Sequence, residues 1–459
     1  MKRFVFLLST AVLTFILSLL CQSNTLVFQE YEGLFLNTPD YFSWLWNQPF
    51  PLSQLMSDFI TQFFRFNVVG PVVVALLVLF AALLGKGIWT KTDLGGVLAA
   101  CAEWLVLAFS TTIKPGIVLL WGLLILWILF RLVRVRLPGP EGKWNTVICT
   151  VLLLITALVV VLHPTVVRKE RWSKVKRSIV TSRWDDVLKA APPKVTEKDR
   201  ELLPFALLAL GEKQQLGERL FSYPVLEEND FDMCLEEDYA NSLFYRAFLY
   251  HRLCCYSESC HELFQLATQQ KHGTSALVLR QLVTEYYLLG NYDLVDKYCR
   301  ILETSSTHKA FVKTFRQFME EGESALPDTS AERGTIDLIT KNPSYNLMLL
   351  QDNGIVGTST QDRLYASLLL QRRLDVFGNF VMKRLERESY YPPLHYLEAM
   401  QVLFEENQNF SRFEFPMIAP QQMKRFQDFL DGIGVRTPEE QKERYGNTYW
   451  FYYYYLGDE

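Results

Sequence analysis

The feature that most constrains the fold is a series of apolar runs in the first third of the 459-residue chain. An apolar stretch of roughly 18 residues is long enough to cross the hydrocarbon core of a bilayer as a helix. The first run also fits a cleaved signal peptide, but residues 18–21 lack the pattern of a cleavage site, so we expect an anchor. We predict about five transmembrane helices within residues 1–165 and a soluble domain over 166–459. The five runs are 4–20, 68–84, 97–112, 116–130 and 147–162.

Basic side chains in the short loops predict the orientation, because Lys and Arg are retained on the cytoplasmic side. With the N-terminus inside, the outer short loops contain only Arg65 and Lys114 as basic residues. We therefore predict a multi-pass protein of the inner (cytoplasmic) membrane with its tail on the periplasmic side. The basic segment 168–177 favours the opposite side, which would follow if run 97–112 were re-entrant. The inner pieces carry Lys2, Arg3, Lys86, Lys91, Arg131, Arg134, Arg136 and Lys143.

The first external loop, residues 22–66, is rich in aromatic residues and contains Glu30, Glu32 and Asp40. Polytopic glycosyltransferases that use lipid-linked sugars carry acids in this loop, where oxygen ligands suit Mg²⁺ or Mn²⁺. These three acids are the candidate catalytic residues, and the alternative is that they are solvated surface acids. Residues 52–64 place apolar and polar side chains on opposite faces of a helix, which predicts an amphipathic helix in the membrane interface.

Glu103 is the one acid inside an apparent span. An ionisable group within a bilayer is costly enough to suggest a function. The alternative is a side chain near a helix end that faces another helix or is protonated. We favour this structural interpretation of Glu103.

From about residue 168 the chain has helical periodicity, with Gly or Pro between the helices. The clearest unit is 279–302, with its turn at Gly290, and a similar unit begins 36 residues earlier, from Leu279 back to Leu243. Tetratricopeptide repeats, which are helix–turn–helix units, have a period of about 34 residues. We expect an all-α fold in which diverged hairpins stack into an α-solenoid with a concave surface.

Histidine and cysteine residues cluster within one of these units. Zinc ligands of these types occur at such short spacings, so His251, Cys254, Cys260 and His261 are the candidate metal ligands. The repeat alignment places Cys254 at the interhelix turn, and small cysteines are common in packed helical interiors. A disulfide is a further alternative if the tail is outside the cytoplasm. We predict no metal and no cofactor.

Other kinds of chemistry leave no pattern in the sequence. The chain has no phosphate-binding glycine loop, dinucleotide fingerprint or serine-nucleophile elbow. Its net charge is −4, and basic stripes are absent away from the predicted membrane region, which argues against nucleic acid as a partner.

Segments of the first loop resemble a family of uncharacterised bacterial multipass membrane proteins. The resemblance lies in Gln29–Leu36, Asp40–Phe42 and Phe59–Phe64. Those proteins join an N-terminal membrane region to a tetratricopeptide-like C-terminal tail, so the resemblance implies the same architecture along nearly the whole chain. It implies no activity.

These observations predict a non-enzymatic multipass membrane protein that presents its helical repeats to a protein partner at the cell envelope. Membrane lipids are the other expected partners. The alternative is a lipid-linked sugar transferase or a related envelope-polymer enzyme that uses the acids of the first loop. A transporter is disfavoured, because one embedded acid provides little for a substrate path.

Overall fold

The structure is a computed structural model that describes residues 2–88, 93–133, 143–231, 239–270, 273–321, 343–352, 358–387, 389–406 and 418–456. In these residues all regular secondary structure is helical, as predicted. The chain forms two compact units. The first contains residues 1–177, 267–284 and 292–325, and the second contains 178–266, 285–291 and 326–459. The boundary expected near residue 165 stays a prediction, because this division groups part of the tail with the apolar helices.

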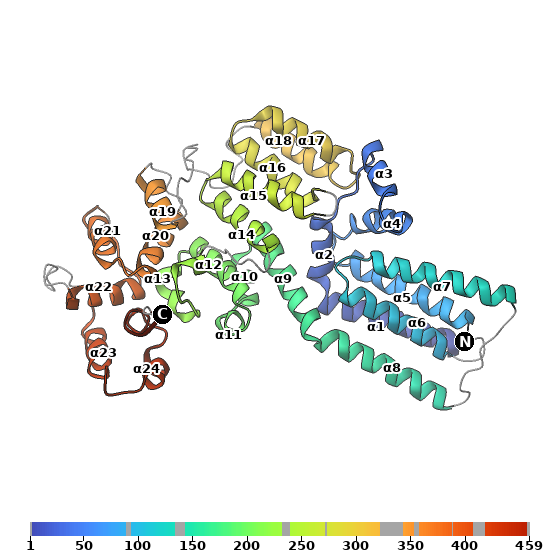
Figure 1. Ribbon diagram of the computed structural model, residues 1–459, viewed down its shortest axis with the longest axis horizontal. Helices are drawn as coiled ribbons and strands as arrows, with labels where there is room; N and C mark the ends of the chain where they lie inside the picture. The colour runs from blue at the N-terminus through green and yellow to red at the C-terminus, as the bar shows by residue number, and fades with distance from the viewer. Residues whose placement is uncertain are drawn as a thin grey trace. The chain divides into compact units, whose positions relative to one another are not determined.

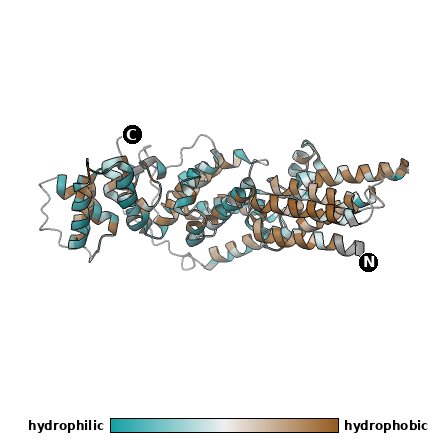
Figure 2. Ribbon diagram, turned by 90° about the horizontal axis from the view of Figure 1, so that it is seen from below, coloured by the Kyte–Doolittle hydropathy of each residue, from teal (hydrophilic) through white to brown (hydrophobic). Residues whose placement is uncertain are grey.

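Each of the five apolar runs lies in a helix of the first unit. These helices lie side by side and are the most hydrophobic part of that unit (Figures 1 and 2). Among the described residues, α5, α7 and α8 are long and apolar enough to cross a membrane, and α6 is a shorter apolar helix. A fourth span results if α1 and the bent helix after it count as one. The helices are α1 (Lys2–Cys21), α5 (Val69–Ile88), α6 (Leu94–Phe109), α7 (Lys114–Val133) and α8 (Lys143–Leu162).

The outer faces of α7 and α8 are apolar as well as exposed. Ile125 is 57% exposed on α7, and Leu154 and Leu158 are about 60% exposed on α8 (60% and 59%). Large contiguous apolar surfaces are rare on soluble monomers and mark contacts with a membrane or a partner. Of the basic loop residues used to predict orientation, Lys91, Arg134 and Arg136 lie outside the described residues.

A sharp bend of 74° separates α1 from α2 (Ser23–Glu32). The side chain of Gln22, at the N-cap of α2, makes no capping hydrogen bond. Instead, the carboxylate of Glu170 accepts hydrogen bonds from the backbone N–H groups of Asn24 and Thr25, both at 2.9 Å. It also accepts from their side chains, at 2.8 Å each. A negative charge at a helix N-terminus is stabilising, so Glu170 holds the start of α2 from 146 residues away.

Two short helices follow α2, and the burial of the second is inverted relative to a soluble protein. They are α3 (Pro39–Trp46) and α4 (Pro51–Thr61). The amphipathic helix predicted in the first loop is confirmed as α4, but its polar face is the buried one: Ser53, Gln54, Ser57, Asp58 and Thr61. The exposed side chains on and around it are Trp46, Phe50, Leu52, Met56, Phe59, Phe63 and Phe66.

Buried hydrogen bonds explain why the polar face of α4 is turned inward. Tyr41 donates its hydroxyl hydrogen to Asp58 at 2.7 Å, and Gln54 donates to the other Asp58 oxygen at 2.7 Å. Buried polar groups need such partners, because an unpaired group costs free energy. The pairing fixes α3 on α4 and leaves the apolar face of α4 uncovered.

The first unit also includes helices from the tail. Helix α9 (Pro164–Val180) follows the apolar bundle, and part of α16 (Ala276–Leu288) joins it with α17 (Tyr292–Glu303) and α18 (Lys309–Glu321). Arg177 of α9 donates hydrogen bonds to Asn24 at 3.1 Å and to Asn67 at 2.8 Å. The segment after the last apolar helix is therefore bonded to both ends of the loop that follows α1.

The predicted helical hairpins share one turn geometry along the tail. In the hairpin of α14 and α15, Cys254 has φ +61°, its N–H donates to His251 O, and the N–H of Cys255 donates to Tyr250 O. This is the Schellman arrangement, in which a left-handed residue ends a helix. It recurs, with the same two backbone bonds, at Ser182, Gln214, Gly290 and Arg372. Four of the five positions are not glycine. The turn therefore keeps its left-handed conformation where the sequence lacks the glycine that is typical of it.

The second unit contains the remaining helices. Contacts in this unit are not limited to neighbours in sequence, since α12 and α13 pack on α20, and α13 also packs on α22. Stacking into a regular solenoid stays a prediction. The α-helices are α10 (Trp184–Ala190), α11 (Pro193–Thr196), α12 (Leu203–Glu212), α13 (Leu216–Arg219), α14 (Tyr239–Arg252), α15 (Tyr256–Gln269), α19 (Pro343–Asp352), α20 (Thr358–Leu370), α21 (Leu374–Arg387), α22 (Leu394–Glu406), α23 (Pro420–Asp431), α24 (Pro438–Tyr445) and α25 (Tyr449–Phe451).

The aromatic C-terminal segment packs inside the second unit. Tyr449 and Trp450 are fully buried. The hydroxyl groups of Tyr449 and Tyr452 donate to the carbonyl oxygens of Leu369 and Leu370, at the end of α20. Tyr452 thus supplies a partner for a carbonyl group at the helix C-terminus, whereas Tyr449 adds a second bond to the Leu369 oxygen, which also accepts from the N–H of Arg372.

Replacing Glu170 with Gln is expected to loosen the start of α2. The amide keeps only one acceptor oxygen and loses the charge, so the cost is about 1–2 kcal/mol. The measurement is the rate of chymotrypsin cleavage within 33–38 in the full chain in detergent, which is expected to rise. Glu197→Gln, at an exposed acid, is the control. Equal cleavage rates in both variants would refute the role of Glu170.

Candidate functional site

The loop of residues 22–66 packs against tail residues within the first unit. The N–H of Ala276 donates to Gly33 O at 3.1 Å, and the N–H of Asn37 donates to Thr304 O at 3.4 Å. The Ser306 hydroxyl donates to the side-chain oxygen of Gln62 at 2.9 Å. Residues more than 200 positions apart thereby form one continuous surface.

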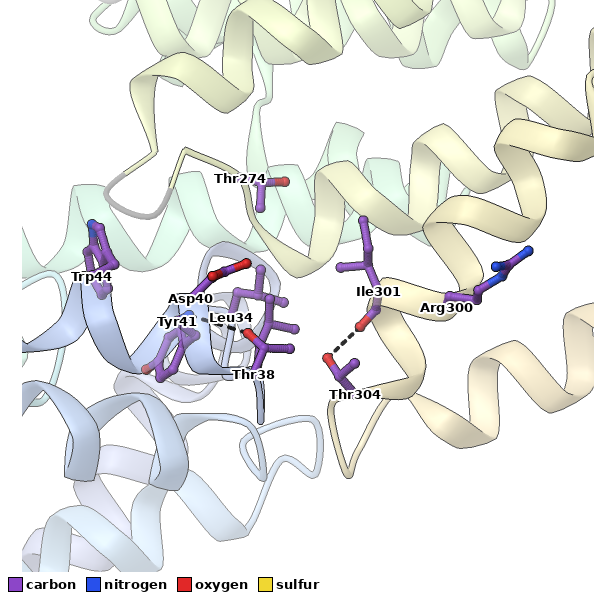
Figure 3. Close-up of a pocket in the computed structure, with 10 residues that line it drawn as sticks. Leu34, Thr38, Asp40, Tyr41, Trp44, Thr274, Arg300, Ile301 and Thr304 are labelled. Atoms are coloured by element: carbon purple, nitrogen blue, oxygen red, sulfur yellow. Dashed lines mark hydrogen bonds between the residues drawn. The ribbon is translucent and has the colours of Figure 1, made fainter.

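A pocket of about 560 Å³ lies at this junction. Cavities of this size are typical of small-molecule sites. Its walls come from the segment before α3, from α3 itself, and from residues around α16 and α17 (Figure 3). The lining residues are Leu34, Leu36, Thr38, Asp40, Tyr41, Trp44, Thr274, Arg300, Ile301 and Thr304.

The three candidate catalytic acids have different environments. Asp40 is exposed, lies in the first turn of α3 and lines the pocket. Glu32 is exposed at the end of α2, whereas Glu30 is 4% exposed. Among the described residues, no group of three or more His, Cys, Asp or Glu side chains is arranged to hold a metal ion. The geometry therefore does not unite the three acids at one metal.

Glu30 is surrounded by groups that lie far from it in the sequence. Its Oε1 lies 3.9 Å from Nδ1 of His308, which is also buried. Burial raises the pKa of Glu30, and the nearby Arg280 and Arg65 oppose this shift. Burial, together with the same two arginines, lowers the pKa of His308 to about 4. At neutral pH His308 is therefore uncharged, and the compensating charge for Glu30 comes from the arginines.

Arg280 is itself held in place by aromatic rings. Its guanidinium lies 5.6 Å from the ring centre of Tyr31 and 4.8 Å from that of Phe311. Such cation–π contacts stabilise a guanidinium in a partly buried position. Because these partners come from α2, α16 and α18, no local sequence signal connects them, and only the tertiary fold reveals the cluster.

Comparison with protein families gives one match. The model of a family of unknown function, DUF6057, matches residues 1–162 and 104–456, which together span nearly the whole chain. The chain belongs to this family. The predicted membership of an uncharacterised family is thereby confirmed. The family is one of unknown function, so it assigns no activity to the pocket or to the acids. Searches of curated proteins and of solved structures returned no match.

The histidine and cysteine candidates for a metal site do not form one in the described part of the chain. His251 lies at the end of α14 with its Nδ1 2.9 Å from Oε1 of Glu285, which is fully buried. The same oxygen accepts a hydrogen bond from Ser259 at 2.9 Å. Cys254 is a free thiol at the turn, and Cys260 is a buried free thiol whose pKa burial raises to about 12. A thiol in this state is a poor metal ligand, because binding requires the thiolate.

Glu103 is fully buried in α6, and neither of its carboxyl oxygens has a hydrogen-bond partner in the described part of the chain. A side chain at Gly116, near the start of α7, would collide with its Oε1. The positive end of the α7 dipole is therefore next to the carboxyl group. This agrees with the structural interpretation in which Glu103 faces another helix.

Replacing His308 with Asn is expected to reduce the loss of folding stability that occurs as the pH falls. The unfolded His308 has a pKa of 6.5 and the folded one a pKa of about 4, so protons bind the unfolded chain more strongly as pH falls. Between pH 6.5 and 4.5 the wild type should lose about 2 kcal/mol through this group. The raised pKa of Glu30 has the opposite sign and is present in both proteins.

The measurement is the free energy of unfolding by guanidinium at both pH values, for the full chain in detergent. The difference in the free energy of unfolding between the wild type and the variant is expected to change by about 2 kcal/mol between the two pH values. An identical pH dependence in the two proteins would contradict the burial of a neutral His308.

Proposed function

We propose that this protein is a multipass membrane protein that presents helical hairpins to a protein partner. The observation that carries the proposal is the combination, in one chain, of apolar helices with exposed apolar faces and five hairpin turns of one geometry. Repeated hairpins build extended surfaces that commonly serve protein recognition. The uncovered apolar face of α4 supports a position in the membrane interface, since the polar face already has partners inside the protein.

The hydrogen bonds of α9 support a specific topology. Glu170 and Arg177 bond to Asn24 and Asn67, so α9 and the first external loop share one side of the membrane. The chain between Asn67 and Glu170 must then cross an even number of times. Four apolar helices, α5 to α8, lie between these residues, so all four cross if α5, α7 and α8 do.

Helix α6 is short for a span. Its 16 residues reach about 24 Å, compared with about 30 Å for a typical hydrocarbon core. Local thinning of the bilayer accommodates such a mismatch at modest cost. A re-entrant α6 would leave three crossings and would separate Glu170 from α2, so we infer five spans and a tail outside the cytoplasm.

The basic segment after α8 has structural partners that explain its charges on the outer side. Arg177 bonds to two asparagines, and Lys176 lies over the rings of Phe28 and Trp172. Lys169 donates to the backbone oxygen of Ser110, and burial lowers its pKa to about 8. These three side chains therefore have partners within the protein.

The topology is testable with reporters fused after Glu459 in a Gram-negative host. Alkaline phosphatase, which is active only outside the cytoplasm, is expected to be active, whereas green fluorescent protein is expected to be dark. The same reporters inserted within 134–142 are the control and should give the reverse result. A fluorescent C-terminal fusion would exclude the proposed side of the tail.

The protein partner is testable by photo-crosslinking of the full chain in native membranes. Tyr391 and Val435 are exposed apolar residues of the second unit, at 67% and 83%. A photoreactive amino acid at either position is expected to give an adduct of defined mass, because exposed apolar residues are typical of interfaces. Lys424, an exposed polar position, is the control. The absence of a discrete adduct at both apolar positions would count against partner binding by this unit.

A lipid-linked sugar transferase is supported by one observation, the position of Asp40 on a pocket wall. Glu30 is buried and Glu32 points to no shared site with it, so Asp40 would have to act without them. Envelope glycans that are unchanged in an Asp40→Ala strain would exclude this function.

A further inference from the structure

We propose that the pocket at α3 binds the ammonium headgroup of a membrane phospholipid, with Asp40 as its counter-ion and Trp44 as an aromatic wall. This inference rests on the proposed membrane location. It adds a ligand class and named binding residues to the junction of the first loop with the tail.

The charge of the pocket favours a cation. The Asp40 carboxylate is exposed and has no hydrogen-bond or ion-pair partner among the described residues. The other wall is formed by the C-terminal end of α17, where Ile301 lies in the last turn and Thr304 directly follows the helix. The C-terminal end of a helix carries partial negative charge. Asp40 and this helix end therefore both attract a positive group.

Arg300 is the one basic residue among the described residues of the lining, and it is engaged elsewhere. Arg300 is bound through Nε and Nη2 to Asp296, one turn earlier on α17. Figure 3 shows its side chain directed away from Asp40. Within the described lining, an anionic ligand would therefore meet the Asp40 carboxylate without an unpaired cation to compensate for it.

The remaining walls suit an organic ammonium rather than a bare metal ion. Trp44 lies one turn after Asp40, and both line the pocket with Leu34 and Leu36. An aromatic ring attracts an ammonium or quaternary ammonium group through its quadrupole. Thr38 accepts from Tyr41 N–H and Thr304 donates to Ile301 O. Asp40 is the one carboxylate among the described lining residues, whereas a hard cation such as Ca²⁺ takes roughly six to eight oxygen ligands.

The position of the pocket favours a lipid as the source of this group. Its wall α3 ends at Trp46, which is 63% exposed, and leads directly to the exposed Phe50 and Leu52. These side chains belong to the apolar surface of α3 and α4 that we assign to the membrane interface. Phospholipid headgroups would therefore be concentrated next to the Asp40 carboxylate.

The test is the thermal unfolding of the full chain in detergent, titrated with phospholipids of the same acyl chains. Phosphatidylethanolamine and phosphatidylcholine carry an ammonium group, and phosphatidylglycerol does not. At least one of the first two is expected to raise the unfolding midpoint at about tenfold lower concentration than phosphatidylglycerol. Asp40→Asn is expected to abolish this preference. Trp44→Leu should weaken it more than Trp44→Phe, which keeps an aromatic ring.

Asp375→Asn is the matched control, because Asp375 is also an exposed acid in the first turn of a helix. It should retain the preference. A second arm uses the water-soluble compounds glycerophosphoethanolamine and glycerophosphocholine. If they bind at concentrations as low as those of the lipids, the site takes soluble ammonium compounds, and the proposal that its ligand is a lipid is wrong. Equal responses to all three lipids, or an unchanged preference in Asp40→Asn, would overturn the site. Loss of the protein from membranes on alkaline extraction would instead refute the proposed membrane location.

Discussion

The first unit depends on one partly buried carboxylate. Glu170 satisfies the first N–H groups of α2 and stands in for the capping side chain that Gln22 does not provide. This contact stabilises the 74° bend after α1 and directs the first loop toward the tail. Without it, α2 would have unpaired donors at its start, and the bend would cost more than a continuous helix. The positions of Glu30 and Asp40 follow from this geometry.

A second constraint is the inverted burial of α4. A helix in a soluble protein turns its apolar face inward, whereas α4 buries Ser57 and Asp58 and exposes Leu52 and Phe59. The hydrogen bonds of Asp58 with Tyr41 and Gln54 account for the inward polar face. The same bonds hold α3 in the orientation that places Asp40 and Trp44 on the pocket wall. The buried hydrogen bonds of Asp58 thus account for both the exposed apolar face of α4 and the position of α3 at the pocket.

The hairpin turns of the tail have the same backbone conformation at glycine and at non-glycine residues. A Schellman turn prefers glycine, because a left-handed backbone is unfavourable for residues with a Cβ. Gly290 fits this rule, but Gln214 and Arg372 adopt the same conformation and keep both backbone hydrogen bonds. The turn at Gly290 was therefore easy to predict from the sequence, whereas the turns at Gln214 and Arg372 have no glycine to mark them. Contacts such as those of α13 with α22 have no periodic signal and required the structure.

The sequence by itself determined the helices, because periodicity and hydrophobicity are local properties of the chain. The five apolar runs, the amphipathic helix of the first loop and the hairpins all follow from such spacing. Only the tertiary structure decided which polar groups meet: Glu170 with α2, Glu30 with His308 and Arg280, and Asp40 with a pocket wall from α17. These partners are separated by more than 100 residues. Their pairing depends on how the helices pack, and the packing depends on the whole chain.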